Sequence, residues 1–476
     1  MTIVFLHQLH DHLISLRVQL SMIVVLLFFV VNGTMYSWRM ETQAQVDSQL
    51  TADLSRRLDG IETIRDAVGA GLRVANQPTG TGFIVESGFD RMWGSLWFGA
   101  ETGRIPFRWF ARDVNFWMSR FENTDWTLIV RLVLSFLCIM LAYDGISGEA
   151  QRGTLRQVFA NPISRGRVLV GKFAAHLAVL LVATLLGTVV SLLIQTMHGA
   201  VELNGALLWA HLLFLVATVV YLSLFLFITL GISALTRTSA SSLVLLTMTW
   251  AVFIVVIPQC SFLIAMQAVE HEEGWMFKSY DVMNEARETL TKGGLALRDS
   301  SLAGQDGFAV ERQVAQRIEE VEKEQMQVRR HGFAQQLQRY EVARAVNLLS
   351  PGFAFQYTIE AMLKTGVAKR ESFFRQALEH RLVVREFVGH RDAADPDSPH
   401  VRYLPGYMSM KPLDGDEIPR FQEKPLSFAE SFAAGVMPLT ILVFEALGAM
   451  LFALWRSTAP TSRDTPLPRT EGVDGS

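Results

Sequence analysis

Apolar stretches long enough to cross a bilayer recur six times along the chain. A membrane-spanning helix needs about 20 predominantly apolar residues, because each residue adds about 1.5 Å to a helix and the hydrocarbon core is about 30 Å thick. The stretches cover residues 17–36, 127–143, 173–194, 207–231, 240–266 and 433–455. This pattern predicts an all-α polytopic membrane protein with six transmembrane helices. Arg131 lies near the start of the second stretch, where we expect its long side chain to extend toward the headgroups.

Residues 1–16 precede the first span and have the pattern of an amphipathic helix. Apolar and polar residues recur at helical spacing, namely Ile3, Val4, Leu6 and Leu9 against His7, His10, Asp11 and His12. We expect this helix to lie along the membrane interface with the histidines on its solvated face, although the three histidines could also bind a metal. No cleavage site follows the first span, so we expect it to stay as an anchor.

Basic residues indicate which loops face the cytoplasm, because short cytoplasmic loops carry an excess of Lys and Arg. Residues 144–172 contain five basic residues against Asp144 and Glu149, whereas the loop after the third span contains none. We therefore expect both termini in the cytoplasm, with the tail 456–476 disordered.

This topology places two long polar insertions, residues 37–126 and 267–432, outside the cytoplasm. In the second, Val310, Val314 and Ile318 recur at helical spacing. The first is rich in aromatic residues, which suit packing against the membrane surface or the second insertion, or an ordinary core. We predict a mainly helical extracytoplasmic domain built from both insertions.

Composition agrees with a membrane protein and excludes several other classes. Hydrophobic residues make up 50% of the chain and charged residues 19%, and the net charge of −3 gives no nucleic-acid signature. Both cysteines lie in apolar runs, and no HExxH or paired CxxC motif occurs. We therefore expect no disulfide framework, no metal and no cofactor. A receptor would need a cytoplasmic signalling domain, and a membrane enzyme a convergent set of acid and base residues.

The stretch GRVLVGKF, residues 166–173, matches the G-x-x-x-x-G-K part of a phosphate-binding loop. Such a loop needs Ser or Thr after the lysine to bind Mg²⁺, and Phe173 has no hydroxyl. The residues that follow form the third span instead of a soluble helix. We expect no nucleotide site here.

The cytoplasmic loop between the second and third spans carries the most informative motifs. It contains the sequence YDGISGEAQRGTLRQVFANPISRGRVLVGKF. Asn161 before Pro162 favours a chain break, which predicts a short helix from Ser147 to Phe159. On such a helix Arg152 and Arg156 would share one face.

At these residues the chain resembles the ABC-2 type permeases, the membrane subunits of a class of ATP-binding-cassette transporters. That family has an acidic residue, then G-T-L, then P-I-S-R, then G-K before the next span. The matching residues here are Glu149, Gly153, Thr154, Leu155, the run 162–165, Gly171 and Lys172. The two insertions and the segment NLLSPGFAFQYTIEAMLKTG, residues 347–366, resemble the branch that includes gliding-motility and copper-enzyme-maturation permeases.

The resemblance implies that ATP binds to a separate cytoplasmic ATPase subunit. The helix that docks on this partner would present Glu149, Arg152, Gly153, Thr154, Leu155 and Arg156, while Lys172 would lie at the inner headgroups. The resemblance also implies a bacterial inner membrane, two copies of the ATPase, and a second copy of the permease or a similar chain. The expected function is export of an unidentified substrate. The alternative is mechanotransmission, in which ATPase work reaches a periplasmic or envelope partner without transport.

Glu445 lies well inside the sixth span, where a carboxylate costs about 2.5–3.5 kcal/mol on insertion scales. It either faces a translocation path or subunit interface, or makes an internal hydrogen bond. Pro258 and Pro438 predict kinks or breaks in the fifth and sixth spans.

Overall fold

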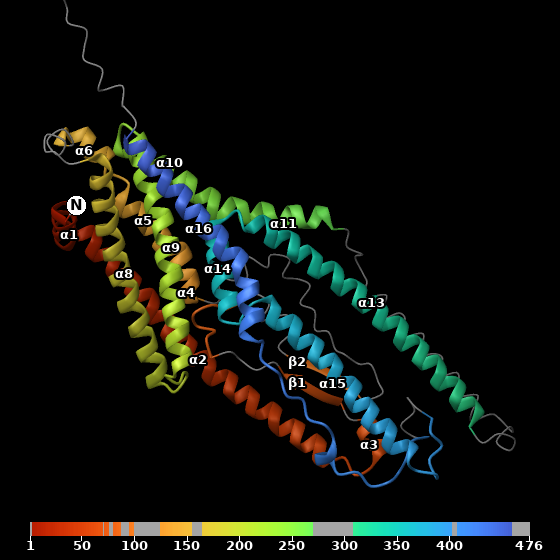
Figure 1. The fold of residues 1–476 in the computed structure, drawn as a ribbon. Coiled ribbons are helices and arrows are strands. Elements are labelled where there is room, and N and C mark those ends of the chain that lie inside the picture. Colours follow the sequence, from red (N-terminus) through yellow and green to blue (C-terminus); the bar gives the residue numbers. More distant parts are fainter. Residues whose placement is uncertain are drawn as a thin grey trace, which may run out of the picture.

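The structure is a computed structural model that describes residues 2–69, 71–75, 80–86, 95–99, 124–154, 164–269, 308–401 and 407–458. Within these ranges, six helices or helical runs are long and apolar enough to cross a membrane, which confirms the predicted six-span, all-α architecture (Figure 1). They are α2 (Leu16–Asp59); the run α4 (Trp126–Leu128), η3 (Ile129–Leu134), α5 (Ser135–Ala142) and α6 (Ser147–Arg152); α8 (Arg165–Met197); α9 (Gly205–Leu235); the run α10 (Ser239–Ala251), η4 (Val252–Val256) and α11 (Ile257–Ala268); and α16 (Phe428–Thr458).

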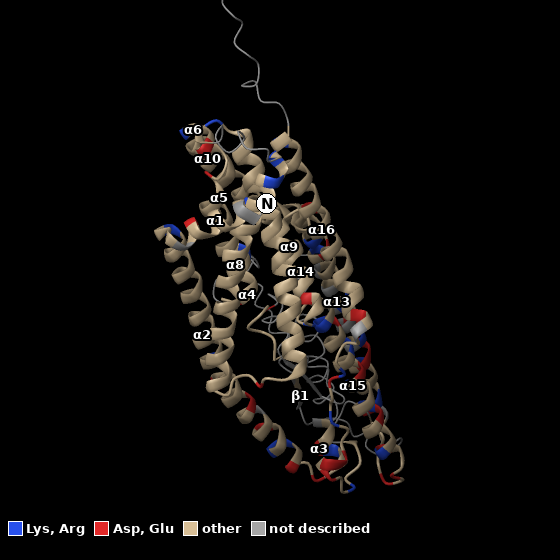
Figure 2. Ribbon diagram, turned by 60° about the vertical axis from the view of Figure 1, so that its left-hand side comes forward, with Lys and Arg blue, Asp and Glu red and all other residues tan. Residues whose placement is uncertain are grey.

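The spanning helices pack in pairs around an aromatic core. Helix α2 lies along α8, and α9 lies along α16. The buried Trp126 ring contacts the rings of Phe29 and Phe214, with centroids 6.0 and 5.3 Å apart. The outward side chains are apolar, including Leu186 and Leu193 of α8 and Phe444 of α16, as a lipid-facing surface requires. Figure 2 shows charged residues gathered toward the two ends of the molecule.

The structure differs at the two prolines, Pro438 and Pro258, for which the sequence predicts kinks or breaks. Helix α16 is continuous through Pro438. Pro258 lies within a continuous helical run, directly after the π-helical η4, so the missing N–H group coincides with a change in the helical hydrogen-bond pattern.

Helix α14 (Pro351–Met362) lies inside the membrane bundle, although its sequence falls in the second insertion. It packs against α9 and α16, and every residue from Pro351 to Glu360 is buried. The Phe355 ring stacks on Tyr221, near the middle of α9, with centroids 4.8 Å apart. The preceding Ser350 Oγ donates to the carbonyl of Phe253 in η4 at 2.5 Å. Contacts with the spanning helices therefore bring this segment to the depth of the bundle.

A second core joins the two insertions beyond the bundle. The first insertion contributes the distal part of α2, α3 (Ile64–Gly69), and β1 (Gly71–Ala75), which pairs antiparallel with β2 (Ser95–Gly99). The second contributes α15 (Val367–Ala393) and η6 (Gly415–Glu417), whereas its long α13 (Ala309–Asn347) packs against α11 and runs away from the bundle in Figure 1. The shared core includes Leu58, Val68, Phe373, Val384 and Leu413. This mainly helical unit is built from both insertions, with one two-stranded sheet that the sequence analysis did not predict.

Gly187 of α8 allows α2 to approach closely. A Cβ atom at this position would lie 2.3 Å from Cδ2 of Phe29, a fully buried ring, whereas a Cβ at Gly448 of α16 would meet nothing within 4 Å. We expect Gly187→Ala to destabilise the bundle by about 1–3 kcal/mol through overpacking, and Gly448→Ala to be neutral or slightly stabilising, because alanine favours a helix over glycine. Thermal unfolding in detergent tests this pair, and equal midpoints for the two variants would contradict the packing described here.

Candidate functional site

The short helix α6 is held in place by serine hydroxyls from two spanning helices. Ser233 Oγ of α9 accepts hydrogen bonds from the backbone N–H groups of Ile146 and Ser147, at 3.2 and 3.0 Å, and donates to the Tyr143 carbonyl at 2.8 Å. Ser242 Oγ of α10 donates to the same carbonyl at 2.8 Å. These bonds satisfy backbone groups where the chain turns from α5 into α6, and so they fix the position of α6 on the bundle.

Glu149 of α6 forms an ion pair with Lys172 of α8. Glu149 Oε1 lies 2.5 Å from Lys172 Nζ, and the two side chains are 23% and 5% exposed. Lys172 Nζ also donates to Gln8 Oε1 of α1 (Thr2–Ile14) at 3.4 Å. The expectation that Lys172 lies at the headgroups is therefore wrong, because its ammonium is buried between α6, α8 and α1.

A second contact between α1 and α8 lies one turn further along both helices. The rings of His12 and His176 meet edge to face with centroids 4.4 Å apart. His12 is only 7% exposed, so it is not on the solvated face of α1, whereas His7 and His10 are exposed. Burial, and then the neighbouring His176, lowers the pKa of His12 to about 4. The ring is therefore neutral near pH 7 and packs without charge repulsion.

The predicted docking residues lie partly at the exposed tip of α6. Arg152, Gly153 and Thr154 are exposed, so a partner protein can reach them. Gly153 has a φ of +79°, in the left-handed region that favours glycine, and it ends α6 at Arg152. The predicted helix of residues 147–159 is thus interrupted at Gly153, and its part from residue 155 onward lies outside the described residues. Leu155 and Arg156 lie outside the described residues.

The other end of the same span carries a buried arginine. Arg131, 7% exposed, donates to Gln356 Oε1 of α14, and its guanidinium lies 4.5 Å from the centroid of the Phe353 ring. Gln356 Nε2 donates in turn to Glu360 Oε1 at 2.5 Å. The expectation that Arg131 extends to the headgroups is wrong, because its side chain turns into the protein. A polar chain from Arg131 through Gln356 to Glu360 joins the second span to α14.

Local backbone features make room for Arg131. It lies in the π-helical segment η3, and such segments leave carbonyl groups without their usual helical partners. The Arg131 carbonyl accepts hydrogen bonds from Tyr221 Oη at 2.9 Å and Ser135 Oγ at 2.5 Å. A Cβ at Gly352 would lie 2.8 Å from Arg131 Cγ, so glycine permits the close approach of α14.

Sequence reasoning missed Gln356 and Glu360. A signal for them exists, since two polar residues four apart interrupt the otherwise apolar stretch PGFAFQYTIEAM and would lie on one helix face.

Glu445 lies on a face of α16 that also carries the buried Leu442 and Ala449. Its Oε2 atom is buried and has no hydrogen-bond partner among the residues that the structure describes. Across the same described ranges, no group of three or more His, Cys, Asp or Glu side chains could hold a metal ion.

The ion pair between Glu149 and Lys172 predicts an asymmetric response to substitution. Removing Glu149 leaves the more deeply buried charge, Lys172, without its carboxylate, so Glu149→Gln should destabilise the protein more than Lys172→Gln does. We expect about 1–3 kcal/mol for Glu149→Gln and partial recovery in the double variant. Thermal unfolding of the three variants forms a double-mutant cycle, and strictly additive effects would show that the pair contributes no coupling.

Comparison with known proteins identifies the family of the chain. A family model described as ABC-2 family transporter protein matches residues 3–456. The chain is also similar to two proteins named probable ABC transporter permease protein NosY. The one from Pseudomonas aeruginosa is 34% identical over 94 residues, 20% of this chain and 31% of the relative. The one from Stutzerimonas stutzeri is 31% identical over 129 residues, 27% of this chain and 46% of the relative.

These matches to the two relatives span less than half of each relative's length. The family model, in contrast, covers nearly the whole chain. In such transporters the ATPase activity lies in a separate subunit. The chain therefore belongs to the ABC-2 transporter family, as a membrane-spanning permease subunit of an ABC transporter.

Proposed function

We propose that this permease couples ATP hydrolysis by a separate ATPase subunit to export of a substrate, with the second span, Trp126–Arg152, as the element that transmits the movement. The observation that carries the proposal is the pair of polar contacts on this span. At one end Glu149 pairs with Lys172, and toward the other Arg131 binds Gln356 of α14. A displacement of α6 by the ATPase would therefore reach α14 through the turn at residues 143–146, then α5 and η3.

The exposed residues of α6 support ATPase docking at this end of the bundle. Arg152, Gly153 and Thr154 are open to a partner, while Glu149 faces inward to Lys172. In our proposal the arginine pairs with acidic groups on the ATPase, and Glu149 fixes the orientation of the docking surface. Leu155 and Arg156 would extend that surface.

The proposed arrangement has α6 and both termini in the cytoplasm of a bacterium and the unit around α15 outside its inner membrane. The excess of basic residues in 144–172 supports this orientation. Two permease copies, or this chain and a similar one, would pair about a two-fold axis, each with its own ATPase copy. ATP binding would then favour one arrangement of the pair over the other.

Glu445 supports export in particular. A buried carboxyl oxygen without a hydrogen-bond partner among the described residues is costly in a bilayer, and polar groups at such depth commonly mark a substrate path. The connection to α14 supports the second candidate, mechanotransmission to a periplasmic or envelope partner. The two candidate functions predict purified complexes of different composition. Mechanotransmission predicts that an outer partner is recovered with the complex in a fixed ratio.

Charge reversal at the exposed tip of α6 tests the docking proposal. We expect Arg152→Glu to abolish co-purification of the ATPase while the permease still inserts into the membrane, because reversal converts an attraction into a repulsion. Arg167→Glu is the matched control. Arg167 is exposed at the start of α8, and in our proposal its charge serves only the orientation of the chain in the membrane. Unchanged association of Arg152→Glu, or equal loss in both variants, would remove α6 as the docking element.

A further inference from the structure

The fifth span contains the π-helical segment η4, which lies beside the start of α14. In an α-helix the Ile257 N–H group would donate to the Phe253 carbonyl, but here it donates to the Val252 carbonyl. The residue after Ile257 is Pro258, which has no N–H group. The Phe253 carbonyl therefore lacks both backbone donors, at the fourth and the fifth residue after it, that a helix could offer.

Ser350, the residue directly before α14, supplies a donor to this carbonyl. Its Oγ atom donates to the Phe253 carbonyl at 2.5 Å, and its side chain is fully buried. The approach is close, because a Cβ atom at Gly352 would lie 3.0 Å from Cδ1 of Ile254 and 2.8 Å from Cγ of Arg131. The first turn of α14 is thus seated between η4 of the fifth span and η3 of the second.

The proline after η4 allows two helical registers, which differ in the carbonyl that each N–H group meets. In the present π register the Phe253 carbonyl is the one that faces Pro258. In a continuous α register Ile257 would donate to Phe253, and the Ile254 carbonyl would face Pro258 instead. Among the described residues, a side-chain hydroxyl bonds the Phe253 carbonyl and none bonds that of Ile254. Because an unsatisfied carbonyl is costly inside a bilayer, the Ser350 hydroxyl selects the π register.

The two halves of the fifth span are attached to different parts of the molecule. On one side of η4, the backbone N–H of Ser239 in α10 donates to Gln151 Oε1 of α6 at 3.3 Å. On the other side, α11 packs along α13, and Arg339 Nε of α13 donates to the Val269 carbonyl after α11 at 3.2 Å. A change of register would turn α11 relative to α10 by one residue, roughly 100° about the axis and about 1.5 Å along it.

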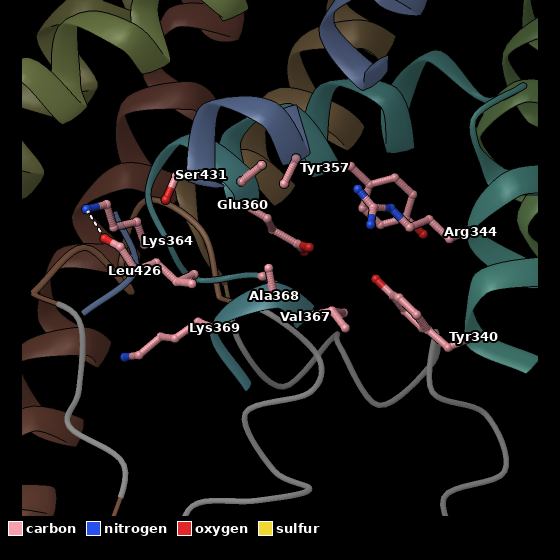
Figure 3. Close-up of a pocket in the computed structure, with 13 residues that line it drawn as sticks. Tyr340, Arg344, Tyr357, Glu360, Lys364, Val367, Ala368, Lys369, Leu426 and Ser431 are labelled. Carbon is pink, nitrogen blue, oxygen red and sulfur yellow. Dashed lines mark hydrogen bonds between the residues drawn. The ribbon is translucent and has the colours of Figure 1, made fainter. Parts of the chain in front are cut away.

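Helix α14 is joined to α13 and to the segment before α16 as well. Arg344 of α13 lies beside Tyr357 of α14, with its guanidinium 5.2 Å from the ring centroid (Figure 3). Asn347 Nδ2, at the end of α13, donates to Tyr357 Oη at 3.3 Å. After α14, Lys364 Nζ donates to the Leu426 carbonyl at 2.7 Å (Figure 3). Both α11 and α14 therefore contact α13, so the position of α13 depends on the contact between Ser350 and η4.

We propose that η4 is a two-state hinge in the fifth span and that Ser350 of α14 is the positioning residue that holds it in the π register. Withdrawal of Ser350 lets Ile257 donate to the Phe253 carbonyl, and α11 then turns relative to α10. Arg131 of the second span binds Gln356 on the same helix as this contact, so movement of the second span reaches the hinge through α14. That drive by the ATPase rests on the proposed function, whereas the hinge is a property of this chain alone.

Spin-label distances across η4 in the purified permease, without the ATPase, test the hinge. Labels at the exposed positions 244 of α10 and 267 of α11, in a Cys260→Ser background, report the placement of the two halves of the span. We expect one distance population in the native chain and a second population in Ser350→Ala. The second population is resolvable, because a turn of one residue moves a label by about 8 Å around a helix of about 5 Å radius.

Two further variants separate a hinge from a general loss of packing. Thr358→Val is the matched control, since it removes a buried hydroxyl of α14 that donates within its own helix, to the Ala354 carbonyl. Deletion of Val255, which is exposed in η4, removes the extra residue of the π turn. The bond from Ile257 to Val252 then becomes an ordinary α-helical bond. The deletion should therefore keep the native distance, and it should suppress the second population of Ser350→Ala.

Each outcome decides the proposal. A native distance in Ser350→Ala, or the same second population in Thr358→Val, would overturn it, as would a second population that persists when Val255 is deleted from Ser350→Ala. Should Ser350→Ala fail to fold, the deletion alone decides, because an ordinary helix cannot lose a residue without turning α11. A shifted distance in the deletion variant, or its failure to fold, would then overturn the hinge. None of these measurements involves the ATPase, so a negative result leaves the proposed function standing.

Discussion

Two buried cations, Arg131 and Lys172, set the constraint around which the rest of the bundle is arranged. A charge removed from water is costly unless a partner replaces its hydration, and a bilayer offers none. Each cation is therefore met by side chains from other elements of the bundle. Lys172 receives Glu149 from α6 and Gln8 from α1, and Arg131 receives Gln356 from α14.

These two requirements bear on the same span and give it a mechanical role. The run Trp126–Arg152 is 27 residues long, with a turn at residues 143–146 between α5 and α6. Near one end it carries Arg131 and at the other Glu149, so the docking helix and the inserted α14 are attached to one element. Because α14 is buried against α9 and α16 as well, displacement of the second span would be felt by several helices of the bundle at once.

The sequence predicts the features that depend on local composition. Six apolar stretches of bilayer length and the loop with G-T-L and P-I-S-R sufficed to predict six spans and to identify the family, because hydrophobic length and short motifs are properties of neighbouring residues. The features it did not predict depend on contacts between distant residues. Lys172 and Arg131 look like headgroup residues by position alone, and only the approach of Glu149, 23 residues away, and Gln356, 225 residues away, turns them inward. Likewise the sequence places α14 in the second polar insertion, and only its contacts show that it lies in the bundle. Gly153 ends α6 through a positive φ angle that composition does not reveal.

The most direct measurement is the ATP-dependent distance between α14 and the α8–α9 turn, with and without the Arg131 contact. Spin labels at position 364, two residues after the end of α14, and at position 202 in the α8–α9 turn would report this distance in the complex with the ATPase. The background is Cys260→Ser, because Cys260 is exposed and Cys138 buried. Our account predicts that ATP changes the distance in the native chain, and that Arg131→Met abolishes the change while the ATPase stays bound. An ATP-dependent change of the same size in Arg131→Met, or none in the native chain, would contradict transmission through the second span.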